Sequence, residues 1–114
     1  MTAKEVQKTR DKEKLIKSIT EWWQVEMETE LLKPENLKKP NWRNVIIKHF
    51  IGHIGINEYL LCEYYRDKNP DKVVEECLKI SNYCMFIADK IMNKNGIQWR
   101  KKINIKNKGK DYVS

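Results

Sequence analysis

Residues 55–79, GINEYLLCEYYRDKNPDKVVEECLK, decide the fold of this chain. An apolar helical pattern runs into this stretch, a short polar break interrupts it, and a second helical pattern runs out of it. Asn69 suits a helix N-cap and Pro70 suits the first helical position, so the break predicts the end of one helix and the start of the next. The predicted helix before the break carries Glu58, and the predicted helix after it carries Glu76. The sequence therefore predicts two carboxylates on neighbouring helices.

Three long helices account for most of the sequence. They are predicted over residues 3–32, 42–66 and 70–93, because apolar residues recur there at spacings of three or four. Residues 33–41 contain two prolines and form the connection between the first two helices. The apolar positions are Ile16, Ile19, Trp23, Met27 and Leu31 in the first helix; Ile47, Phe50, Ile51, Ile54, Leu61 and Tyr65 in the second; and Val73, Cys77, Ile80, Cys84, Ile87 and Ile91 in the third. The predicted fold class is all-α, a bundle of about three main helices.

The end of the chain has a different pattern and a different charge. We predict one helical domain over residues 1–96 and a basic tail over residues 97–114. Apolar residues alternate in the tail, which favours an extended or β-like segment, although disorder is also open. From residue 94 onward there are seven basic residues and one acid, a net +6 of the chain's +7. Attraction to nucleic acid is therefore expected to come from the tail.

Composition places the chain in a reducing compartment. Its three cysteines are an odd number in apolar helical stretches, which is typical of buried free thiols. The amino terminus has no apolar signal core, and no apolar run is long enough to span a membrane. We expect no membrane partner and a cytoplasmic location. The abundance of Lys, Asn and Ile would also suit a viral protein in the host cytoplasm.

Other residue patterns on the second and third helices give weaker signals. His49 and His53 are four residues apart, a spacing that can hold zinc, but no third ligand is evident, and polar-face histidines are the simpler interpretation. Tyr83 and the tyrosines of the second helix could stack a base, although aromatic residues at helical spacing usually pack in cores or interfaces. No nucleophile arrangement and no glycine-rich phosphate loop is present.

Several segments together resemble the MazG-like branch of the all-α nucleoside triphosphate pyrophosphohydrolases. The resemblance covers about residues 20–92. Its segments are EWWQVEMETELL at 21–32, NWR at 41–43, NEYL at 57–60, NPD at 69–71, ECLKISNY at 76–83 and IAD at 87–89. The resemblance implies dimers or tetramers of helical bundles. It also implies hydrolysis of a nucleoside triphosphate to the monophosphate and pyrophosphate, with magnesium held by an ExxE pair on one helix and an ExxD pair on the next.

Only two of the four acids in the family's metal motif are present. Glu58 and Glu76 fall at acid positions and would be the magnesium ligands, whereas Gly55 and Lys79 replace the other two acids. Magnesium prefers near-octahedral oxygen ligation, which a lysine ammonium opposes. Lys79 is one helical turn from Glu76, so we expect an ion cluster of Glu58, Lys79 and Glu76 in place of the metal cluster. On the same resemblance, Asn82 and Asp89 are candidate nucleotide contacts.

These patterns leave three hypotheses for function. The favoured one is a non-catalytic or much-weakened MazG-like scaffold, with no catalytic residues and no cofactor, which acts as a binding or interaction module. The second is a magnesium-dependent nucleotide pyrophosphohydrolase that uses Glu58 and Glu76. The third is a small nucleic-acid-binding protein that uses an aromatic residue for stacking and basic residues for phosphate neutralisation. Its candidate residues are Trp99, Arg100, Lys101, Lys102, Lys106, Lys108 and Lys110. A homodimer is expected, because the second and third helices have more apolar surface than one amphipathic helix covers.

Overall fold

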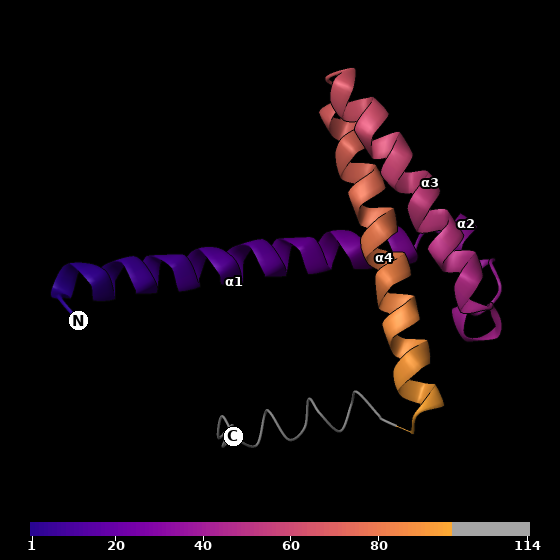
Figure 1. Cartoon of the computed structure of the whole chain (residues 1–114), viewed down its shortest axis with the longest axis horizontal. Helices are drawn as coiled ribbons and strands as arrows, with labels where there is room; N and C mark the ends of the chain where they lie inside the picture. The colour runs from indigo at the N-terminus through magenta and orange to yellow at the C-terminus, as the bar shows by residue number, and fades with distance from the viewer. Residues whose placement is uncertain (97–114) are drawn as a thin grey trace. The chain divides into compact units, whose positions relative to one another are not determined.

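The computed structural model describes residues 1–96 of the chain, and most of these residues are helical. They fall into two units, which are described separately because the chain divides between Lys39 and Pro40. Three long helices dominate and no strand occurs in this part of the chain, which confirms the all-α prediction (Figure 1). No helix within residues 1–96 is long and apolar enough to cross a membrane. The predicted extended tail over residues 97–114 lies outside the described residues.

The first unit is formed mainly by helix α1, Ala3–Leu31, which closely matches the predicted range of 3–32. Thr2 caps it by a reciprocal arrangement: the Thr2 hydroxyl oxygen accepts from the Glu5 amide, and the Glu5 carboxylate accepts from the Thr2 amide, both at 3.2 Å. A second, short helix, α2 (Pro34–Leu37), follows inside the predicted connection, with Pro34 at its first position. None of the residues of α1 is buried. In the apolar stripe of α1, Ile16 and Ile19 are exposed, whereas Trp23, Met27 and Leu31 are half-buried.

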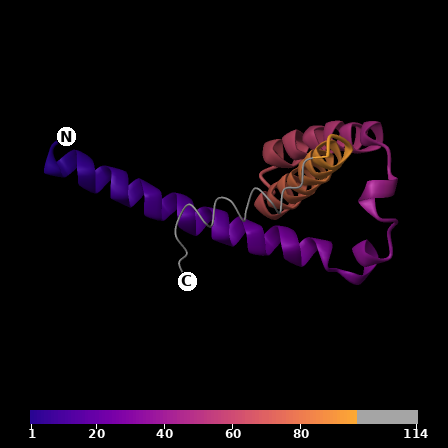
Figure 2. The same ribbon diagram turned by 90° about the horizontal axis from the view of Figure 1, so that it is seen from below.

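The second unit is a helical hairpin. Helix α3 spans Ile47–Arg66 and helix α4 spans Pro70–Lys94, and the two lie side by side in both views (Figures 1 and 2). The predicted break behaves as expected, because the Asn69 side chain accepts from the Lys72 amide at 3.4 Å and Pro70 opens α4. Lys68, in the turn, has a φ of 56°, a left-handed conformation that non-glycine residues seldom adopt.

The start of the second predicted helix is wrong by five residues. Trp42–Asn44 form a short 3-10 helix, η1, and α3 begins only at Ile47. An α-helix that began at Trp42 would use the carbonyls of Arg43 and Val45 for its own amides. The Lys90 ammonium of α4 instead donates to both carbonyls, at 2.9 Å for Arg43 and also to Val45. A long-range contact therefore overrides the local apolar pattern.

The hairpin buries few apolar side chains. Phe50 and Leu78 are its buried apolar residues among those described, and they are accompanied by three buried polar side chains. Many large apolar side chains of the hairpin stay exposed: Ile46, Ile51, Ile56, Tyr59, Tyr65, Val74, Met85 and Ile91. The prediction of buried thiols is wrong for Cys62 and Cys84, which are exposed and free, while Cys77 is half-buried. A two-helix layer with so small a core has apolar surface available for a further partner.

Candidate functional site

The candidate site centres on Lys79 of α4. The Lys79 ammonium lies 3.4 Å from a carboxylate oxygen of Glu76 and 3.7 Å from one of Glu75. These acids precede Lys79 by three and four residues, so all three side chains share one side of the helix. The Glu76 side chain is only 3% exposed, whereas that of Lys79 is 37% exposed. A cation at the edge of the hairpin thus neutralises a buried carboxylate.

The ion pairs continue one turn toward the start of α4. The Lys72 ammonium lies 3.1 Å from the other carboxylate oxygen of Glu75. Its hydrogen bond to Glu75, and secondly the negative charge of Glu75, raise the pKa of Lys72 above its ordinary value. Lys72 is therefore fully protonated at neutral pH. The resulting row of two acids and two lysines extends over two turns of one helix.

Glu58 does not join this row. It is exposed on α3 and has no ion pair among residues 1–96, so Glu75, and not Glu58, is the second acid at Lys79. The physical reason is the register of α3. Consecutive residues of a helix point about 100° apart, and it is Asn57 that is buried, at 6% exposure. Glu58 is thereby turned away from the position that the expected cluster required.

Three buried side chains each retain a polar atom without a hydrogen-bond partner. They are the Asn57 amide nitrogen, one oxygen of Glu76 and the amide oxygen of Asn82. An unsatisfied buried group of this kind costs roughly 1–3 kcal/mol. Sequence reasoning missed the burial of Asn57, although one signal could have found it: Asn57 is seven residues, or two turns, after Phe50 on the apolar side of the helix.

The side chains around Glu76 do not fit a magnesium ion. No group of three or more His, Cys, Asp or Glu side chains suited to a metal occurs within residues 1–96. Glu76 has one oxygen engaged by the Lys79 ammonium, which brings a positive charge to the place where a divalent cation would bind. Gly55 is exposed, and a Cβ atom added there would meet no atom within 4 Å.

The two candidate nucleotide contacts differ in their surroundings. Asn82 is buried at 4% exposure. Asp89 accepts three hydrogen bonds: from the Trp42 indole nitrogen at 2.8 Å and from Nε and Nη2 of Arg43, both at 2.9 Å. Asp89 lies ten residues after Lys79, about 15 Å along the helix at 1.5 Å per residue. The structure therefore assigns Asp89 to a contact with η1 and keeps it apart from the ion pairs of Lys79.

We refer to the contact of Trp42, Arg43, Phe86, Asp89 and Lys90 as the η1 clasp. The Trp42 and Phe86 rings are stacked, with centroids 4.9 Å apart and planes 10° apart. The hydrogen bonds to Asp89, and secondly its charge, raise the pKa of Arg43, so the guanidinium stays charged at every working pH. The clasp fixes the chain before α3 onto the end of α4. No local pattern could have predicted it, because its two halves are more than forty residues apart.

The histidines and Tyr83 belong to a ring cluster between α3 and α4. The His53 ring is stacked on Tyr83 at 5.4 Å and lies 4.4 Å from that of His49. Phe50 lies 5.7 Å from Tyr83. His49 is exposed and His53 is half-buried, as the simpler interpretation of these histidines expects. These contacts also fix the antiparallel register of the hairpin.

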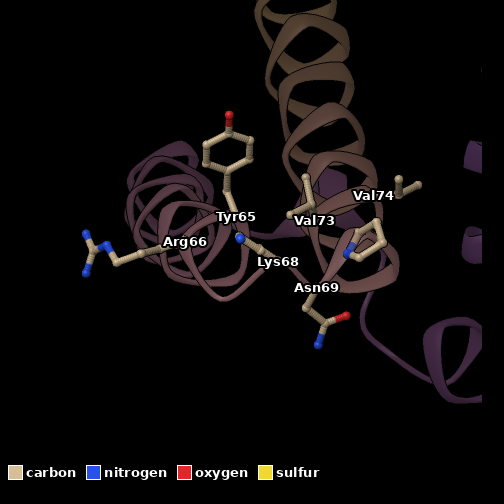
Figure 3. A pocket seen from close by; sticks show the side chains of 7 residues that line it. Tyr65, Arg66, Lys68, Asn69, Val73 and Val74 are labelled. Atoms are coloured by element: carbon tan, nitrogen blue, oxygen red, sulfur yellow. The ribbon is translucent and has the colours of Figure 1, made fainter.

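A shallow cavity of about 640 Å³ lies at the turn of the hairpin (Figure 3). Tyr65 and Arg66 extend from the end of α3, while Val73 and Val74 extend from the start of α4. The remaining lining residues belong to the turn or open α4: Lys68, Asn69 and Pro70. Its walls are mainly apolar with two cations at the rim. The cavity was not predicted, because it arises from the geometry of the turn.

Comparison with protein-family models, with curated proteins and with solved structures finds no match for this chain. The fold and the site together define an all-α protein whose hairpin carries a lysine-centred row of ion pairs. The predicted nucleic-acid contacts, from Trp99 to Lys110, lie outside the described residues.

Proposed function

We propose that this chain is a MazG-like helical protein whose metal site is incomplete and which works as a self-associating binding module. The observation that carries the proposal is Lys79, paired with Glu75 and Glu76 at a position where the resembled family has an acid. A metal site that is replaced by ion pairs within α4 gives no Lewis acid for phosphate chemistry. The exposed apolar side chains of α1 and of the hairpin support self-association as a homodimer.

A hydrolysis assay tests the first half of this proposal. The full chain is incubated with Mg²⁺ and each common nucleoside and deoxynucleoside triphosphate, and pyrophosphate release is measured. We expect no release above the protein-free rate. Release that disappears in Glu76→Gln would overturn the proposal in favour of a magnesium-dependent pyrophosphohydrolase.

Restoring the acids tests whether the ion pairs occupy a former metal site. Gly55→Glu combined with Lys79→Asp restores all four family acids, and the Gly55 position has open space for the new side chain. Titration calorimetry with Mg²⁺ is expected to detect binding that the natural chain lacks, with the ion drawing residue 55 and Glu58 from the exposed side of α3 toward Glu76. Gly52→Glu combined with Lys72→Asp is a matched control, because it makes the same changes at another open glycine and at a neighbouring lysine. Equal Mg²⁺ binding by both variants would contradict a former site at Lys79.

A further inference from the structure

The middle of α1 has an exposed apolar patch. Leu15 is 59% exposed, Ile16 52%, and Ile19 and Trp22 51% each. Trp23, half-buried, packs beside Trp22 with ring centroids 5.4 Å apart. These five residues lie within about 60° of the direction of Ile19, since each residue turns the helix by 100°. We call them the α1 patch.

Charged residues extend the same face of the helix on both sides of the α1 patch. Lys12 and Glu26 each lie seven residues from Ile19, and Lys8 and Glu30 each lie eleven residues from it. Seven and eleven residues are close to two and three full turns, so all four side chains lie within about 20° of the direction of Ile19. From its N-terminal to its C-terminal end, this face therefore carries two lysines, an apolar centre and two glutamates.

This order is complementary to itself when it is reversed. If Ile19 of one copy lies opposite Ile19 of a second copy in antiparallel orientation, Lys12 lies opposite Glu26 and Lys8 lies opposite Glu30. A two-fold axis produces each of these pairs twice. A parallel pair in register would instead place lysine against lysine and glutamate against glutamate.

The charge of the whole helix has the same asymmetry. Residues 3–17 contain six basic and three acidic residues, whereas residues 18–31 contain four glutamates and no basic residue. The last turn of α1 has no basic residue to complement its carbonyl end. Acids near a helix C-terminus and bases near its N-terminus oppose the helix dipole, so this distribution weakens α1 on its own. An antiparallel partner helix turns the same distribution into an attraction.

We propose that a second copy of this chain docks on α1 in antiparallel orientation, through the α1 patch and the flanking Lys8, Lys12, Glu26 and Glu30. The inference rests on the self-association proposed above and names its interface. Lys8, Lys12 and Glu26 have no ion pair within residues 1–96, and Glu30 lies 2.7 Å from Lys33 of its own chain. Pairing with a second copy satisfies the three charges and covers the apolar patch at the same time.

Charge reversal in the full chain tests the orientation. Lys12→Glu and Glu26→Lys each convert two attractive pairs of the dimer into repulsive ones, and the double variant restores two attractive pairs with the signs exchanged. Sedimentation equilibrium is expected to give a dimer dissociation constant that rises at least about tenfold in each single variant. The double variant is expected to return to within about threefold of the natural chain.

Arg10→Glu and Glu28→Lys are the matched controls. They make the same charge changes on the opposite side of α1, about 180° from Ile19, and are expected to change the dissociation constant little. Circular dichroism checks that every variant retains its helix content. A dimer that the single variants leave unchanged would overturn the α1 interface while self-association stands. A monomeric natural chain, or weakening in both single variants without recovery in the double variant, would also overturn the antiparallel pairing.

A zero-length carbodiimide cross-link gives an independent readout. The reagent joins an ammonium to a carboxylate that it contacts, and a mixture of ¹⁴N- and ¹⁵N-labelled chains separates links between copies from links within one. Mass spectrometry is expected to find Lys12 joined to Glu26 in mixed-label pairs. If Lys12 is joined in mixed-label pairs only to acids of the hairpin, the proposal is contradicted. Helix α1 then binds the hairpin of the second copy.

Discussion

At the scale of single residues, Lys79 determines what the candidate site can do. Its ammonium is the cation nearest to Glu76 in the ion pairs of α4, and the second oxygen of Glu76 has no hydrogen-bond partner. A carboxylate on a side chain that is only 3% exposed depends on such a cation, because burial penalises its charged form. The same residue therefore places a positive charge beside Glu76 and compensates a buried negative charge.

Lys79→Met is expected to destabilise the fold. Removing one partner of a buried pair leaves an uncompensated charge, and the partial exposure of Lys79 reduces the cost to about 1–3 kcal/mol. Urea unfolding followed by circular dichroism measures it. Lys79→Met combined with Glu76→Gln is expected to recover most of the loss, and Lys72→Met, next to the more exposed Glu75, is expected to cost less than about 1 kcal/mol. If Lys79→Met is as stable as the natural chain, this role of Lys79 is contradicted.

At the scale of helices, the termini are well encoded and the contacts between helices are not. The caps at Thr2 and Asn69 and the stop before Gly96, which has a φ of 70°, are local chemistry that a sequence displays. The start of α3 could not be predicted, because the carbonyls of residues 43 and 45 accept from Lys90, which lies more than forty residues later near the end of α4. Which of Asn57 and Glu58 is buried depends on the helix register, and the place of Asn57 two turns after Phe50 could have shown that Glu58 lies outside the ion cluster.

Asn69→Ala tests the cap of α4. The Asn69 side chain satisfies one of the free amides at the start of α4, so its loss is expected to lower the free energy of unfolding by about 1 kcal/mol. Asn93→Ala removes a similar side chain from an exposed position in the last turn and is expected to change stability by less than about 0.5 kcal/mol. Equal effects of the two variants in thermal unfolding would argue against the cap.

Trp42→Ala tests the η1 clasp. The substitution removes the stacking on Phe86 and one hydrogen bond to Asp89, and since Trp42 is 36% exposed the expected cost is about 1–2 kcal/mol. The control is Tyr59→Ala on α3, where the side chain is 65% exposed, with an expected cost below about 0.5 kcal/mol. A Trp42 variant no less stable than the Tyr59 variant would show that the clasp adds little.

At the scale of the whole molecule, two units and a basic tail divide the properties of the chain. The first unit presents the self-complementary face of α1, and the hairpin carries the ion pairs and its own exposed apolar side chains. Most of the net positive charge belongs to the tail. Self-association and attraction to polyanions are thus expected to depend on different segments.

Removal of residues 97–114 separates these two properties. The truncation removes six basic residues and one acid, so the net charge falls from +7 to +2. If the chain binds nucleic acid, binding in an electrophoretic shift assay is expected to weaken steeply with salt and to be lost on truncation, because phosphate contacts release counterions. The dimer dissociation constant is expected to stay the same. Binding that survives truncation would place the nucleic-acid surface elsewhere on the chain.

The η1 clasp also has a consequence for the order in which the hairpin folds. The turn between α3 and α4 joins residues that are close in sequence, whereas the Trp42–Asp89 hydrogen bond closes a loop of 47 residues. Closing a long loop costs more chain entropy, so contacts of this kind tend to form after the local ones. Trp42→Ala is therefore expected to speed unfolding while it leaves the refolding rate nearly unchanged in stopped-flow measurements. The clasp therefore forms late in folding, and its main kinetic effect is to slow the unfolding of the hairpin.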